Sequence, residues 1–111
     1  MPFIVDTGAA FTFLSATDAM RYLNVPRAGL DSNNWTDAIS VDGMGGKLRG
    51  RSTSALYGFR HGDRVVESIP GPMLVGDINS DGLPSLLGWD LLKYFRLDIH
   101  GGNQTIVLHR M

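Results

Sequence analysis

The chain has 111 residues, which is the size of one domain with a single hydrophobic core. Its ten basic and eleven acidic side chains give a net charge of −1, so no electrostatic partner such as nucleic acid or an anionic membrane is expected. Cysteine is absent, which excludes disulfides, thiol nucleophiles and cysteine-ligated zinc. No apolar stretch is long enough to span a membrane and no leader is recognisable, so a cytoplasmic location is the default expectation.

High glycine content favours a fold of short strands. Fourteen glycines and five prolines are typical of strands joined by tight turns. Residues 3–5 form the first apolar run and predict a buried strand, which ends at Asp6 and turns at Gly8. A second strand is predicted at residues 11–14.

A short helix is expected directly after the second strand. Ser15 is a good N-cap, and Asp18 three residues later completes a start that resembles a capping box. The helix should end near Asn24, because Pro26 follows. Residues 27–37 are polar and rich in turn formers, so we expect a loop there.

The rest of the chain is predicted to be mostly strands. Residues 39–59 predict a long hairpin with a glycine-rich tip and a polar return arm, which should stand off the body of the domain and move. A second short helix is expected at residues 90–95, after a buried run at 86–88. Further strands are predicted at residues 56–60, 64–69, 73–75, 96–100 and 105–109. The expected fold is mostly β, with two short helices and a closed or partly closed barrel.

Asp6 is the candidate catalytic residue. A carboxylate directly after an apolar strand is either a turn former or a reactive group placed in a desolvated position. Two later features favour the second interpretation. One is the glycine-tipped hairpin, and the other is the run Leu86-Leu87-Gly88, which opens a helix.

With Asp6-Thr7-Gly8-Ala9 in front of those two features, the chain resembles the retropepsins, the single-domain aspartic proteases of retroviruses and of related bacterial and cellular proteins. The matching stretches are residues 3–14, 41–51 and 84–99. The resemblance implies one domain over residues 1–111, folded as a closed barrel with a flap hairpin and one or two short helices. It also indicates a bacterial or cellular member that is truncated at its N-terminus, because the family's leading strands are missing before Asp6.

The resemblance implies a reaction that needs two copies of the chain. Retropepsins use two aspartates, yet this sequence holds one Asp-Thr-Gly, since Asp42-Gly43 and Asp81-Gly82 lack the threonine. The implied active form is a homodimer in which Asp6 and its symmetry mate share a proton. The ionised carboxylate would activate a water and the protonated one would polarise the peptide carbonyl. The implied substrate is an extended peptide or protein segment, and no metal or cofactor is implied.

The resemblance also implies roles for residues near Asp6. Thr7 would hydrogen-bond across the dimer axis, and Gly8 would let the backbone approach the substrate. Ala9 lacks the hydroxyl that some members carry at this position, so the aspartate pair should tolerate a less acidic pH. Phe11 would form an apolar pocket wall, which suggests hydrophobic side chains beside the cleaved bond.

Two further segments would complete the site. Thr12 matches a position that bonds toward the Gly88 segment, where Asp90 is the expected partner. The flap tip would fold over a bound peptide, and Met44 would give it an adaptable apolar contact. The flap-tip residues are Gly43, Met44, Gly45 and Gly46.

The sequence departs from the family at positions that brace the dimer. Trp89 stands where the family usually has arginine, and Ala10 and Phe11 stand where acids are common. The arginine–carboxylate network of retroviral dimers is therefore missing. This departure and the short N-terminus favour an alternative, a non-catalytic retropepsin-like module for dimerisation or peptide binding, whereas the intact Asp-Thr-Gly favours the enzyme.

Two metal or phosphate motifs are incomplete. Residues 77–82 match the first half of a calcium loop, but Gly88 occupies the position of the final acidic ligand, so a calcium-dependent binding module is a third, weaker hypothesis. Residues 43–47 resemble part of a phosphate loop, but Leu48 replaces the required serine or threonine. The three histidines show no metal-binding spacing and are expected at the surface or in an interface.

Overall fold

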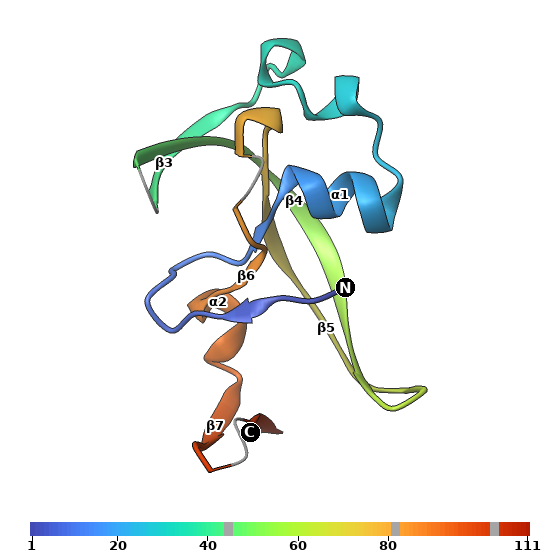
Figure 1. The fold of residues 1–111 in the computed structure, drawn as a ribbon, viewed down its shortest axis with the longest axis vertical. Coiled ribbons are helices and arrows are strands. Elements are labelled where there is room, and N and C mark those ends of the chain that lie inside the picture. The colour runs from blue at the N-terminus through green and yellow to red at the C-terminus, as the bar shows by residue number, and fades with distance from the viewer. Residues whose placement is uncertain (44–45, 81–82, 103–104) are drawn as a thin grey trace.

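The computed structural model describes residues 1–43, 46–80, 83–102 and 105–111. These residues form a six-stranded sheet in the order β1-β6-β2-β5-β4-β3 and a separate hairpin of β7 and β8 (Figure 1). The strands are β1 Ile4–Val5, β2 Phe13–Leu14, β3 Ile39–Gly43, β4 Gly46–His61, β5 Arg64–Gly76, β6 Leu86–Leu87, β7 Phe95–His100 and β8 Thr105–Arg110. The helices are α1 Ala16–Leu23 and α2 Trp89–Leu92, with 3₁₀ turns at η1 Arg27–Leu30, η2 Ser32–Asn34 and η3 Ile78–Ser80.

The part of the chain that the structure describes is mostly β, as predicted, and contains two α-helices. The described strand pairings form an open sheet whose outer strands are β1 and β3, so closure into a barrel stays a prediction. No helix among the described residues is long and apolar enough to cross a membrane.

Three short strands hold both ends of the loop that follows Asp6. β1 pairs in parallel with β6, so Ile4 lies opposite Leu86. β2 pairs antiparallel with the same strand, and Phe13 also lies opposite Leu86. β1 and β2 therefore flank β6 on its two sides, and the loop from Asp6 to Thr12 connects them. Each of these three strands has only two residues.

β4 and β5 form one long antiparallel ribbon where three separate strands were predicted. Residues 64–69 and 73–75 are joined into a single strand that runs through Pro70 and Pro72. Proline is tolerated on a strand where its missing N–H faces no partner. The other neighbour of β5 is β2, which pairs only at Leu74 and Val75, so the proline segment has a free edge among the described residues.

Other predicted boundaries were wrong in detail. α2 ends at Leu92 instead of residue 95, because Phe95 begins β7 and its ring packs 5.2 Å from that of Phe59. The predicted loop at residues 27–37 contains η1 and η2. The predicted glycine tip of the β3–β4 hairpin lies partly outside the described residues, at 44–45.

Helix α1 begins and ends where the sequence predicted. The hydroxyl of Ser15 accepts a hydrogen bond from the backbone N–H of Asp18 at 3.1 Å. Asn24 ends the helix in the left-handed conformation, with φ 55°. The helix buries Ala16 and Ala19 against Leu14 and Leu30, which form one of two hydrophobic clusters.

The second hydrophobic cluster lies under α2 and the ribbon. It contains Tyr57, Ile69, Leu87, Leu91, Leu92 and Phe95. The Tyr57 hydroxyl donates to the carbonyl of Pro72, so the buried polar group is satisfied. Burial, with a smaller contribution from the charge of Asp90, raises the pKa of the Tyr57 hydroxyl well above its ordinary value of 10.0.

The Tyr57→Phe variant tests this buried hydroxyl. At pH 7 it should lower the free energy of unfolding by about 1 kcal/mol, because the Pro72 carbonyl loses its donor. Above the ordinary tyrosine pKa of 10.0, the unfolded wild type releases a proton that the folded state keeps, so wild-type stability falls. The stability gap between wild type and variant should therefore narrow as pH rises past that value in urea titrations. Tyr22→Phe, at an exposed tyrosine of α1, is the control, and an equal gap at all pH values would contradict the assignment.

Candidate active site

The carboxylate of Asp6 is held by its own turn at the end of β1. The backbone N–H of Asp6 donates to the carbonyl of Leu87 at 3.0 Å, which fixes the residue to β6. One carboxylate oxygen of Asp6 accepts the N–H of Gly8 at 2.9 Å, and the carbonyl of Asp6 accepts the N–H of Ala9. A Cβ at Gly8 would lie 3.3 Å from that same carboxylate oxygen and crowd it. Asp6 is half-buried, so its carboxylate is oriented by the backbone and remains accessible.

The segment from Gly88 to Asp90 lies directly against the Asp6 loop. The N–H of Trp89 donates to the carbonyl of Ala9 at 2.7 Å, and the N–H of Asp90 donates to that of Ala10 at 3.2 Å. A Cβ at Gly88 would lie 2.4 Å from the carbonyl oxygen of Phe11, closer than any real contact of that kind. Glycine is therefore the residue that permits this approach.

Hydrogen bonds between the buried Thr12 and Asp90 join the Asp6 loop to the segment from Gly88 to Asp90. Thr12 is fully buried, and its hydroxyl donates to the Asp90 carboxylate at 2.6 Å. The backbone N–H of Thr12 donates to both carboxylate oxygens of Asp90, at 3.0 and 3.1 Å. The same hydroxyl accepts the N–H of Gly88 at 3.0 Å. The structure therefore contains the contact expected between Thr12 and Asp90, and hydrogen bonds to a charged group are among the stronger ones.

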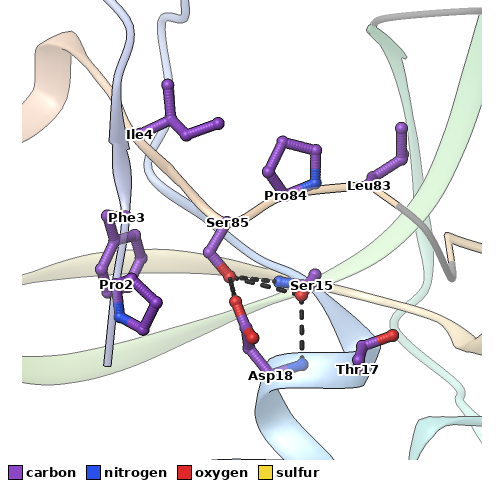
Figure 2. Close-up of a pocket in the computed structure, with 9 residues that line it drawn as sticks. All are labelled: Pro2, Phe3, Ile4, Ser15, Thr17, Asp18, Leu83, Pro84 and Ser85. Carbon is purple, nitrogen blue, oxygen red and sulfur yellow. Dashed lines mark hydrogen bonds between the residues drawn. The ribbon is translucent and has the colours of Figure 1, made fainter.

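A second polar cluster fixes the start of β6, and the sequence did not predict it. Figure 2 shows the Ser85 hydroxyl between Ser15 and Asp18. This hydroxyl donates to the Asp18 carboxylate at 2.6 Å and accepts the backbone N–H of Ser15 at 3.0 Å. The carbonyl of Ser85 accepts the N–H of Ile4 at 2.9 Å. Ser85 thus connects β1, β6 and the start of α1.

This cluster corrects the predicted capping box. A capping box needs the side chain of Asp18 to accept the N–H of Ser15. In the structure, that N–H goes to Ser85 instead, and the Asp18 carboxylate is used to hold Ser85. No periodic pattern in the sequence points to Ser85, because its two partners lie 67 and 70 residues away along the chain.

The structure places three of the remaining predicted site residues, Thr7, Gly8 and Ala9, in a shallow surface depression next to Asp6, and among the residues that it describes it shows no contact between this depression and the predicted flap tip. Thr7, Gly8, Ala9, Ala10 and Trp89 line a shallow depression of about 430 Å³. Trp89 is 51% exposed and Phe11 is 55% exposed, so both large side chains are free to contact another molecule. Gly43 and Gly46 pair at the end of β3 and β4, whereas Met44 and Gly45 lie outside the described residues.

The calcium-loop prediction gains no support from the described residues. Asp77 is buried, and its carboxylate accepts hydrogen bonds from the hydroxyl of Ser32 and from the backbone N–H of Asn79. Asp81 lies outside the described residues. Within the described ranges, no group of three or more histidine or acidic residues could hold a metal ion.

The fold is similar to that of a known aspartic protease. Among solved structures, the chain is similar to a retropepsin-like aspartic protease from Rickettsia conorii, with a TM-score of 0.60 and 22% sequence identity. The similarity covers 96% of this chain and 77% of that chain. No protein-family model and no curated protein matches the sequence. At this identity the likeness shows the fold, so the chain has a retropepsin-like fold.

The Gly88→Ala variant tests the close approach at the site. The added methyl group meets the Phe11 carbonyl, which belongs to a paired backbone and cannot move freely, so we expect a loss of about 2 kcal/mol in unfolding free energy. The measurement is urea denaturation followed by circular dichroism. Gly101→Ala is the matched control, because a Cβ there meets nothing within 4 Å. Equal stability of the two variants would contradict the described packing.

Proposed function

We propose that the chain is one subunit of a homodimeric aspartic endopeptidase, in which each subunit contributes Asp6. The observation that carries the proposal is the Asp6 turn: its carboxylate is accessible and oriented by the N–H of Gly8. The retropepsin-like fold supports the same class of function, because the solved structure to which the chain is similar is that of an aspartic protease.

The proposed chemistry needs a second carboxylate close to Asp6. The sequence contains one Asp-Thr-Gly, so in this proposal one subunit supplies one carboxylate of the pair. Two carboxylates brought close together cannot both be ionised, and they hold one proton between them. The ionised one removes a proton from a water as that water attacks the peptide carbon. The protonated one donates a hydrogen bond to the carbonyl oxygen on which negative charge develops.

Exposed apolar side chains support association of two copies. Trp89 and Phe11 beside the Asp6 turn are both more than half exposed. On the β7–β8 hairpin, Ile99 is 75% exposed and Ile106 is 47% exposed. Exposed apolar groups of this size are typical of interaction surfaces. In this proposal they replace the arginine–carboxylate network that the sequence lacks.

The remaining site residues have supporting roles in the proposed dimer. Thr7 hydrogen-bonds across the axis, and Gly8 and Ala9 form the floor under the substrate backbone. The flap at residues 43–46 covers an extended peptide, which binds by adding a strand between flap and floor. Phe11 forms an apolar pocket wall, while Thr12, Gly88 and Asp90 hold the loop in place. The proposal also includes closure of the domain into the retropepsin barrel, and its mechanism uses a water and no metal or cofactor.

The Asp6→Asn variant tests the proposed activity. An amide cannot accept the proton from the water, so cleavage of a peptide library at pH 4 to 7 should fall by at least about 100-fold. The fold should be retained, because the amide oxygen can still accept the N–H of Gly8. Cleavage by the wild type should also be inhibited by pepstatin.

Asp63→Asn is the matched control, since Asp63 lies in the exposed turn between β4 and β5. This control should cleave like the wild type. Absence of cleavage by a wild type that sedimentation shows to be dimeric would overturn the enzyme. That result would support the alternative, a non-catalytic module for dimerisation or peptide binding.

A further inference from the structure

Asp77 is a buried carboxylate that the proposed mechanism does not use. It directly follows β5, begins the incomplete calcium loop of the sequence and is 2% exposed. One of its carboxylate oxygens accepts the hydroxyl of Ser32 at 2.8 Å, and the other accepts the backbone N–H of Asn79 at 3.1 Å. Because a buried carboxylate is costly unless it is hydrogen-bonded, these contacts hold Asp77 in one position.

Asp77 lies where the β3–β4 hairpin leaves the sheet. At Gly50, β4 pairs with Ile39 of β3 on one side and with the last residue of β5 on the other. From Arg49 to Gly46, β3 is the one neighbouring strand of β4 among the described residues, and Figure 1 shows the hairpin projecting past the end of β5. The N–H of Asp77 donates to the carbonyl of Arg49 at 3.1 Å. Asp77 therefore contacts β4 one step beyond the last pair of β4 with β5.

The Asp77 carboxylate also holds the segment that leads into β3. Its partner Ser32 begins η2, and β3 follows at Ile39. Leu30, in the turn just before Ser32, is buried in the hydrophobic cluster under α1. Ile78, the neighbour of Asp77, packs against the same cluster. Both ends of the hydrogen bond between Ser32 and Asp77 are thus attached to the body of the domain, so Asp77 ties both strands of the hairpin base to that body.

Another link at the hairpin base lies in water. The guanidinium of Arg51 on β4 lies 3.1 Å from the carboxylate of Asp37, which precedes β3, and both side chains are about half exposed. Exposed ion pairs contribute little to stability, because water and salt screen them. A hydrogen bond to a charged acceptor is stronger when it is buried. The bond between Ser32 and Asp77 is therefore the stronger of these two links.

From these contacts we infer that Asp77 is a positioning residue, which through Ser32 and Arg49 fixes the direction in which the β3–β4 hairpin leaves the sheet. The inference rests on the proposed function, in which this hairpin is the flap that covers the substrate. In that function an extended peptide pairs with the hairpin through main-chain hydrogen bonds, in the ground state and in the transition state alike. Loosening of the hairpin base should therefore raise KM and leave kcat, which depends on the Asp6 turn, unchanged.

The test combines cleavage kinetics on one peptide that the wild type cleaves with amide hydrogen exchange followed by mass spectrometry. Ser32→Ala removes the hydroxyl donor to Asp77 and should raise KM at least about fivefold, with kcat within about twofold of wild type. Exchange at residues 39–43 and 46–50 should become at least about tenfold faster, while exchange in the β7–β8 hairpin stays unchanged, because the opening is local. Ser32→Thr keeps a hydroxyl and should restore both KM and the exchange rates.

Asp37→Asn is the matched control, because it removes the exposed ion pair at the same hairpin base and should leave KM and exchange within about twofold of wild type. The inference is overturned if the wild type cleaves and Ser32→Ala keeps the wild-type KM and exchange rates, or if Asp37→Asn has the same effect as Ser32→Ala. It is also overturned if Ser32→Ala loosens or unfolds the whole chain, β7–β8 included, since the role of Ser32 would then be general stability. A wild type that cleaves nothing overturns the proposed function instead, and the exchange rates then decide alone whether Asp77 fixes the hairpin.

Discussion

The close approach between the Gly88 segment and the Asp6 loop is the constraint on which the rest of the site depends. Two backbone hydrogen bonds and a shared carboxylate require the two segments to touch, and only glycine at position 88 leaves room for the Phe11 carbonyl. Asp90 then satisfies the buried N–H and hydroxyl of Thr12, so the approach leaves no polar group of this pair without a partner. Among the described residues, no buried side-chain nitrogen or oxygen is left unpaired.

The contact between the Asp6 loop and the segment from Gly88 to Asp90, here called the brace, determines where the Asp6 carboxylate points. Asp6 is fixed to β6 by its own N–H, and the loop after it is fixed to the start of α2. Ser85, which directly precedes β6, connects β1 and β6 to α1 through its hydrogen bond to Asp18. The carboxylate is thus oriented by paired elements on both sides, as the proposed catalysis would require of a preorganised group. The brace explains the orientation of one carboxylate, while the proposed reaction takes its second carboxylate from a symmetric copy.

Local chemistry made much of the site predictable from the sequence. Asp6 follows an apolar run and precedes a glycine, Ser15 is a strong N-cap, and Thr12 with Asp90 was expected from the family resemblance. These features depend on neighbours in the chain or on a short motif. The extent of β5 was not predictable in the same way, because Pro70 and Pro72 normally end strands and are accepted here only at a free edge. The hydrogen bonds of Ser85 with Ser15 and Asp18 also escaped prediction, because they join residues far apart in the chain.

The most direct test of the shared active site mixes wild-type and Asp6→Asn chains in equal amounts and measures peptide cleavage after the subunits have exchanged. If each active centre needs one intact carboxylate from each of two chains, random pairing leaves about one quarter of the cleavage activity of the same total amount of wild type. If a single chain carries the whole reaction, one half of that activity remains, and this result would contradict the account.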